Sequence, residues 1–297
     1  MTTSMASKSP GLIRAALAWA RMIRIEHSIF ALPFAYMGLF WSAQGWPGWR
    51  IFVFLTLAMV MVRSFAMTHN RLADLPLDAL NPRTRDRALV TGEIRVKEAY
   101  LFLGVSAALF LFACAFINLP VFLLAFLALG WSAVYSYTKR WTSLCHFFLG
   151  SVLGLAPLAG WIAFVPELTL PAVFLFLGVL FWVGGFDILY ATQDAGFDRE
   201  NGLKSIPARH GLETSFALAG FAHVNAALFF LLAGITVGAT WPYYLAWVIV
   251  AAVLYIEHKL ISPDNLEKLN VSFFTLNALV SLILLAGVLG DVFLVSA

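Results

Sequence analysis

The chain has 297 residues, of which 61% are hydrophobic and 12% are charged, and its mean hydropathy is +0.86. Because soluble domains carry about a quarter charged residues, this composition argues against a large soluble helical core and predicts an all-α, polytopic membrane protein. The net charge of +3 gives no reason to expect a nucleic-acid partner.

Nine apolar stretches are long enough to cross the hydrocarbon core as helices. The predicted spans are 22–43, 51–72, 97–117, 119–138, 143–164, 171–191, 214–237, 242–261 and 271–295. Two longer polar connections, 73–96 and 192–213, interrupt the pattern. We interpret residues 1–297 as a single transmembrane domain.

Basic residues predict the orientation of these spans. Every Lys and Arg except Arg50 and Arg63 falls at the N-terminus or in the connections that follow spans 2, 4, 6 and 8, helix ends included. Positive residues accumulate on the cytoplasmic side of membrane proteins. The N-terminus and both long connections are therefore expected in the cytoplasm.

A first acidic cluster ends the second span, in the sequence "NRLADLPLD". Asn70, Asp74 and Asp78 are spaced by four and are expected on one helix face. Pro76 disfavours continuation of the helix, so Asp78 is the least firmly placed of the three.

A second acidic cluster ends the sixth span, in the sequence "DILYATQDAGFD", with Asp187, Tyr190, Asp194 and Asp198. Asp187 and Asp194 are seven residues apart and share a helix face. Each cluster is followed by a basic connection, a glycine and another span. This weak internal repeat predicts that the two clusters face each other.

Carboxylates close to a membrane are costly and usually mark a functional cavity. Crowded carboxylates suit a hard cation such as Mg²⁺, which prefers one or two carboxylates together with substrate phosphates. The nearby basic residues are Arg83, Arg85, Arg87, Lys139, Arg140 and Lys204. They fit a metal-bridged diphosphate, although each could instead serve only as a positive-inside residue or a span-end anchor.

Arg63 lies seven residues before Asn70 and therefore on the same face, two turns deeper. A guanidinium at that depth needs a polar partner, which is either the carboxylate of Glu26 or an anionic aromatic substrate. His27, beside Glu26, is expected to be an interfacial histidine rather than a base. The remaining histidines show no metal-ligand spacing and are interpreted as structural: His69, His146, His210, His223 and His258.

These motifs resemble the UbiA superfamily of intramembrane prenyltransferases. The residues that carry the resemblance are Asn70, Asp74 and Asp78; Arg83, Thr84, Arg87, Leu89 and Gly92; Tyr135 and Lys139; and Asp187, Tyr190, Asp194 and Asp198, followed by Lys204 and Ser205. They occur in the family's order. Ala88 stands where the family has proline, which is expected to loosen the loop without removing a ligand.

The resemblance implies a UbiA-like fold of nine transmembrane helices around a central cavity. It also implies transfer of a polyprenyl group from polyprenyl diphosphate to an aromatic acid at the bilayer, assisted by Mg²⁺. The implied metal ligands are Asn70, Asp74, Asp78, Asp187, Asp194 and Asp198. The implied catalytic residues are Asp74, Asp187, Asp194 and Lys139. The implied substrate-binding residues are Asn70, Arg63, Arg83, Arg87, Tyr135, Tyr190, Lys204 and Glu26.

The first span, "IRIEHSIFALPFAYMG", and Arg63 are most similar to the bacterial, 4-hydroxybenzoate polyprenyltransferase-like branch. This implies quinone biosynthesis at the bacterial cytoplasmic (inner) membrane. A dihydroxynaphthoate acceptor in the futalosine route to menaquinone is the alternative; haem O synthase and lipid ether synthases are less similar. A cation transporter or a non-catalytic binder of prenyl diphosphate remains open, but a transporter does not explain why the carboxylates cluster with Arg and Lys at one side of the membrane.

Overall fold

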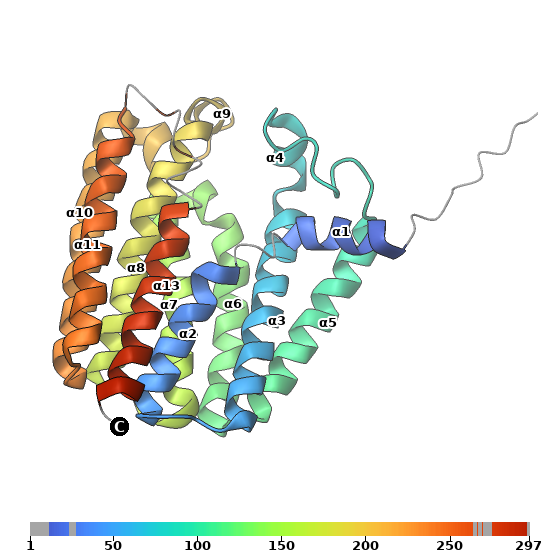
Figure 1. Ribbon diagram of the computed structural model, residues 1–297. Coiled ribbons are helices and arrows are strands. Elements are labelled where there is room, and N and C mark those ends of the chain that lie inside the picture. Colours follow the sequence, from blue (N-terminus) through green and yellow to red (C-terminus); the bar gives the residue numbers. More distant parts are fainter. Residues whose placement is uncertain (1–11, 24–27, 264–265, 267–268, 270–274, 296–297) are drawn as a thin grey trace, which may run out of the picture.

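The computed structural model describes residues 12–23, 28–263, 266, 269 and 275–295. Its long helices run side by side as a bundle (Figure 1). They are α2 (Ser28–Ala43), α3 (Trp49–Ala73), α5 (Val96–Ala115), α6 (Leu119–Trp141), α7 (Cys145–Phe164), α8 (Leu170–Ala191), α10 (Ile206–Val237), α11 (Trp241–Leu260) and α13 (Asn277–Gly290). The short elements are α1 (Leu12–Ile23), α4 (Leu75–Leu80), η2 (Thr192–Asp194), α9 (Ala195–Glu200) and the π-helical segment η4 (Asp291–Val295).

Eight helices of the described chain are long and apolar enough to cross a membrane. With α2, which has 16 residues, they account for the nine predicted spans. Large apolar side chains such as Leu101, Val224 and Trp241 are exposed on the outside of the bundle. A surface of this kind is stable in lipid and unfavourable in water, so the chain is a multi-pass membrane protein.

The first predicted span, 22–43, was wrong at its start. Helix α1 ends at Ile23 and lies across the ends of α3 and α5, whereas α2 begins at Ser28 (Figure 1). The reason is amphipathicity: Met22 is buried beside Ile94, while the neighbouring Arg21 is exposed and pairs with Glu93 at 3.0 Å. A helix with one polar face is more stable along an interface than across hydrocarbon.

The predicted start of the span at 214 was also late. Helix α10 begins at Ile206, and its first turns are separated from the rest by Gly211, whose φ is +81°. This left-handed backbone conformation is open to glycine at little cost. The short first segment of α10 therefore turns toward the second acidic cluster before the long apolar run begins.

Close approach between α2 and α7 shapes the middle of the bundle. A Cβ atom added to Gly160 would lie 1.9 Å from the carbonyl oxygen of Ala35, and one added to Gly38 would lie 2.1 Å from that of Pro157. Small residues let helix backbones touch in membranes, where packing rather than the hydrophobic effect drives association. Helices α2 and α7 thus form a tight central pair.

Two apolar cores flank this pair. The larger core packs α2 and α7 against α8, α10, α11 and α13, with Trp182, Phe230 and Tyr243 fully buried. The second core packs the same pair against α3, α5 and α6 around Leu55 and Phe110. Helices α4 and α9 stand apart from each other at one end of the bundle (Figure 1). Both polar connections therefore lie at the same end of the bundle.

Candidate active site

A cavity of about 400 Å³ lies between α3, α6, α7 and α8 and reaches up to α4 and α9. Its lining includes all six acidic and amide residues that the two sequence clusters contain: Asn70, Asp74, Asp78, Asp187, Asp194 and Asp198. The prediction that the two clusters face each other is confirmed.

The first cluster surrounds a break in the helix at Asp74. Helix α3 ends at Ala73 and α4 starts at Leu75, yet Asp74 N bonds to Asn70 O at 2.9 Å and Asp78 N bonds to Asp74 O at 2.8 Å. These hydrogen bonds keep the helical spacing across the break. Pro76 lies in the first turn of α4, where a missing N–H costs little, so it does not displace Asp78 from the cavity.

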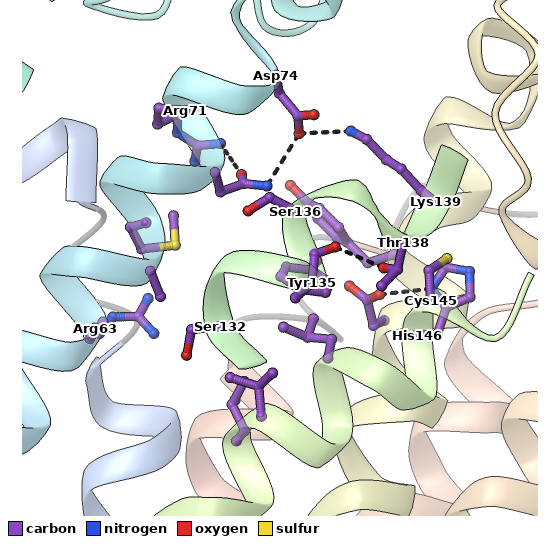
Figure 2. Close-up of a pocket in the computed structure, with 18 of the residues that line it drawn as sticks. Arg63, Arg71, Asp74, Ser132, Tyr135, Ser136, Thr138, Lys139, Cys145 and His146 are labelled. Carbon is purple, nitrogen blue, oxygen red and sulfur yellow. Dashed lines mark hydrogen bonds and ion pairs between the residues drawn. The ribbon is translucent and has the colours of Figure 1, made fainter. Parts of the chain in front are cut away.

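Cations balance the first cluster. Lys139 Nζ, at the end of α6, lies 2.7 Å from Asp74 Oδ2, and the amide of Asn70 donates to the same oxygen at 3.2 Å (Figure 2). Arg87 NH1 lies 2.5 Å from Asp78 Oδ2. Because Asp74 and Asp78 are both buried, these pairs remove most of the cost of their charge.

The two clusters are joined by Arg83. Its guanidinium bonds to both carboxylate oxygens of Asp194, with Nε at 2.9 Å from Oδ1, and its NH1 donates to the hydroxyl of Tyr190 at 3.4 Å. The amide of Asn81 also donates to Asp194 Oδ1 at 3.2 Å. Burial disfavours the charge on Arg83, but its hydrogen bonds to Asp194 and the charge of that carboxylate outweigh burial and raise the pKa of Arg83.

The deepest carboxylate of the second cluster has a histidine as its partner. His146 Nδ1 lies 2.7 Å from Asp187 Oδ2, and the backbone N–H of Ile206 donates to His146 Nε2 at 3.2 Å. Nearer the end of the bundle, the hydroxyl of Ser205 donates to Asp198 Oδ2 at 2.6 Å. His146, which was interpreted as structural from the sequence, has a buried ring that lines the cavity and contacts a site carboxylate.

Arg71 is a second cavity residue that the motifs did not indicate. It is buried, lines the cavity and donates from NH1 to Asn70 Oδ1 at 3.2 Å. Its position directly after Asn70 was the one feature of the sequence that could have indicated a place in the cavity. The pattern-based prediction counted it only among the positive residues at the end of a span.

Arg63 lies deeper in the cavity on α3, with Ser132 of α6 on the facing wall (Figure 2). Tyr135 also lines this region. Glu26, the alternative partner of Arg63, lies outside the described residues. The structure thus agrees with the predicted depth of Arg63 and with its orientation toward the same cavity as Asn70.

Lys204 was expected to bind substrate, but the structure does not bring it to the cavity. Its backbone N bonds to Lys139 O at 2.7 Å, and its amine points to Trp141 O at 3.2 Å. The backbone bond holds the connection against the end of α6, and the side chain lies on the outside of that contact. Ser205, the next residue, lines the cavity instead.

The donor set fits Mg²⁺ that is completed by phosphate oxygens. Asp74 Oδ1 is buried and makes no hydrogen bond within the described chain; Arg140 NH2 lies 3.7 Å from it. Among the described residues, no group of three or more His, Cys, Asp and Glu side chains forms a metal cage. Mg²⁺ commonly takes only one or two carboxylates and fills its shell with water and phosphate, so an incomplete oxygen set matches it.

Below these polar groups the cavity wall is apolar. Phe110, Leu149, Leu153 and Phe186 line it. The cavity therefore combines a charged end, between the two acidic clusters, with a hydrophobic interior. Such an arrangement can bind an amphiphile that has an anionic head and a hydrocarbon tail.

Comparison with known proteins gives matches in sequence and in fold. The model of the UbiA prenyltransferase family matches residues 31–279. A 4-hydroxybenzoate octaprenyltransferase of Methylobacillus flagellatus is 30% identical over 293 residues, covering 96% of this chain and 97% of that protein.

Two solved structures have a similar fold. A UbiA homolog from Aeropyrum pernix K1 superposes with a TM-score of 0.82 at 32% identity, covering 90% of this chain and 98% of that one. A UbiA homolog from Archaeoglobus fulgidus bound to GPP and Mg²⁺ has a TM-score of 0.72 at 23% identity, with coverage of 93% and 99%, and supports the fold alone.

Proposed function

The chain belongs to the UbiA prenyltransferase family, and on that premise we propose that it transfers a polyprenyl group from polyprenyl diphosphate to an aromatic acid in quinone biosynthesis. The observation that carries the proposal is one cavity in which two acidic clusters meet Arg83, Arg87 and Lys139. The preferred acceptor is 4-hydroxybenzoate, after the Methylobacillus relative. A dihydroxynaphthoate is the alternative.

The charged end of the cavity is assigned to the diphosphate. The residues that would hold Mg²⁺ are Asn70, Asp74, Asp78, Asp187, Asp194 and Asp198. When bound, Mg²⁺ supplies Lewis-acid stabilisation of the negative charge that develops on the leaving diphosphate.

The chain's own cations act on the same charge. Lys139, Arg83 and Arg87 already point into this end of the cavity and pair with carboxylates there. On substrate binding they donate to diphosphate oxygens, so the charge released when the allylic C–O bond breaks is met by donors that are already in place. Tyr190, held beside Arg83, keeps that guanidinium oriented.

The deeper polar residues are assigned to the acceptor. Arg63 pairs with the acceptor's carboxylate, and Tyr135 packs beside the ring. The allylic carbon then bonds to an electron-rich ring carbon, and that carbon loses its proton. Both candidate acceptors carry a carboxylate, so the Arg63 contact suits either one.

The apolar wall is assigned to the prenyl chain. Phe110, Leu149 and Leu153 exclude water from the region next to the charged groups, which protects an allylic cation from hydrolysis. The exposed apolar surface places the protein in a bilayer, and we assign it to the bacterial inner membrane with the N-terminus and both acidic connections in the cytoplasm.

A membrane assay tests the reaction. Purified protein in lipid nanodiscs receives Mg²⁺ and labelled polyprenyl diphosphate with either 4-hydroxybenzoate or a dihydroxynaphthoate, and products are identified by mass. Asp74→Ala and Asp187→Ala are expected to lose turnover while they still accumulate in the membrane. Absence of a prenylated aromatic with every acceptor, in an assay that detects a known prenyltransferase, contradicts the proposal.

The two competing functions give different results in the same material. A divalent-cation transporter moves Mg²⁺ into sealed vesicles without forming a prenylated product. A non-catalytic binder retains labelled prenyl diphosphate without turnover. Either result would assign the corresponding function to the chain in place of prenyl transfer.

A further inference from the structure

Asp187 is paired with a histidine, whereas Asp74, Asp78 and Asp194 are each paired with a lysine or an arginine. His146 is the second residue of α7, Asp187 lies near the end of α8, and Ile206 is the first residue of α10. The 2.7 Å and 3.2 Å hydrogen bonds of the imidazole therefore connect three helices at one point. With 3% of its surface exposed, the ring has little room to turn.

The contact with Ile206 determines where the ring carries its proton. A backbone N–H can only donate, so His146 Nε2 must accept and cannot hold a hydrogen. The remaining ring hydrogen is then on Nδ1, which donates to Asp187 Oδ2. The same backbone contact thus fixes both the tautomer and the direction of the donor.

Asp187 is thereby held by one oxygen only. Its Oδ1 makes no hydrogen bond to any described residue, and the side chain lines the cavity. The hydrogen bond to Oδ2 therefore leaves Oδ1 available to a ligand in the cavity.

The adjacent residue extends this arrangement. Ser205 precedes Ile206 and donates to Asp198 Oδ2 at 2.6 Å. Two consecutive residues at the start of α10 thus orient two carboxylates of the second cluster, Asp198 directly and Asp187 through the imidazole. Gly211 permits the backbone turn that brings this short segment over the cavity.

We propose that His146 is a positioning residue, whose ring holds Asp187 through Oδ2 with Oδ1 directed at the metal-diphosphate site. This role rests on the proposed function. It differs from the direct substrate contacts assigned above, because His146 acts only through Asp187. Partners that hydrogen-bond a ligating carboxylate typically change metal affinity or activity by about 10–100-fold when removed.

Two amide substitutions separate the two hydrogen bonds. The amide nitrogen of His146→Asn can take the place of Nδ1 and keep the donor to Asp187. The longer side chain of His146→Gln places its amide near the position of Nε2 and can keep only the contact to Ile206. His146→Ala removes both, and His210→Asn, on an exposed residue outside the cavity lining, is the matched control.

Each variant is measured in two ways in nanodiscs. The first is the Mg²⁺ concentration for half-maximal prenyl transfer, together with KM for the acceptor. The second is binding of Mn²⁺, followed by electron paramagnetic resonance, in the presence of a thio analogue of geranyl diphosphate that does not ionise. Mn²⁺ suits the same oxygen ligands as Mg²⁺, and this binding requires no turnover.

We expect His146→Ala and His146→Gln to need about 10–100 times more Mg²⁺ and to bind Mn²⁺ correspondingly more weakly. His146→Asn and His210→Asn should stay close to the wild type, and acceptor KM should not change in any variant. Equal defects in the Asn and Gln variants overturn the proposal, as does wild-type metal dependence in His146→Ala. Failure of both amides to fold also overturns it, because His146 would then be structural. If the wild-type chain binds Mn²⁺ but forms no product, the proposed function is contradicted. The role of His146 in metal binding is then still supported by the Mn²⁺ measurements on the variants.

Discussion

Lys139 and Asp74 meet at 2.7 Å, and their contact joins the end of α6 to the break between α3 and α4. The carboxylate is buried and the amine is 30% exposed at its side chain, so the lysine reaches into the cavity from its rim. The pair holds a cation in the position where a diphosphate would need one.

Lys139→Met tests that position, since methionine keeps the length of the side chain but not its charge. We expect kcat/KM for the prenyl diphosphate to fall about 100- to 1,000-fold, the usual effect of removing one donor from a developing negative charge. Acceptor KM should be unaffected. Lys97→Met, on an exposed residue of α5 outside the cavity, is the control, and similar losses in both variants would count against a specific role for Lys139.

Arg63→Ala is expected to raise KM for the aromatic acid about 10- to 100-fold, which is the range for losing a hydrogen bond to a charged group. KM for the prenyl diphosphate should remain unchanged, because Arg63 lies deeper in the cavity than the acidic clusters. Steady-state kinetics with each substrate varied in turn measures both values. If acceptor KM is unchanged, the assignment of Arg63 to the acceptor is withdrawn.

Because the pKa of Arg83 is raised, we expect its contribution to prenyl diphosphate binding to stay constant as pH becomes alkaline. A pKa above the ordinary arginine value keeps the guanidinium charged throughout the usable pH range. Arg83→His introduces a group that loses its charge as pH rises, so affinity for prenyl diphosphate should decline between about pH 6 and pH 8. Wild-type affinity should show no such decline, as measured by equilibrium binding in nanodiscs. Parallel pH profiles for the two proteins would show that the charge of Arg83 does not contribute.

Chelation of divalent metal by EDTA should abolish prenyl transfer and leave the melting temperature in detergent unchanged. The reason is that Asp74, Asp78 and Asp194 are already paired with Lys139, Arg87 and Arg83 without metal, so the fold does not need a metal ion to balance these charges. Activity should return when Mg²⁺ is added back. A clear drop in melting temperature on chelation would instead identify a structural metal.

Gly160→Ala is expected to destabilise the protein by about 1–3 kcal/mol, the typical cost of overpacking. The added methyl group would lie 1.9 Å from the carbonyl of Ala35, and both atoms belong to helices that touch along their length. Gly130→Ala on α6 is the control, because a Cβ there meets no atom within 4 Å. Thermal unfolding in the same detergent compares the two variants, and equal stabilities would disprove the close packing of α2 and α7.

The sequence predicted the features that depend on composition and regular spacing. Apolar runs of helical length located the spans, and the four-residue spacing placed Asn70, Asp74 and Asp78 on one side of the chain. The shared pattern of the two clusters also predicted that they face each other. These features follow from local periodicity, which persists in the folded chain.

The features that the sequence did not predict depend on long-range contacts or backbone direction. His146 and Asp187 are 41 residues apart, and a single histidine in an apolar run carries no pattern that identifies its partner. Lys204 follows the motif, but the backbone at that point turns its side chain outward. The start of the first span was misplaced because hydropathy alone does not distinguish an amphipathic interfacial helix from a membrane span.

The bridge between Arg83 and Asp194 has a consequence for how the protein is made. The two residues are 111 positions apart, whereas Arg87 and Asp78 are only 9 apart and Lys139 and Asp74 are 65 apart. At typical translation speeds, the interval between the synthesis of Arg83 and of Asp194 is on the order of ten seconds. During that interval the amino-terminal half can neutralise its own aspartates as it enters the bilayer. When the carboxy-terminal half is synthesised, Asp194 can pair with an Arg83 that is already in the bilayer. The order of synthesis therefore favours correct docking of the two halves.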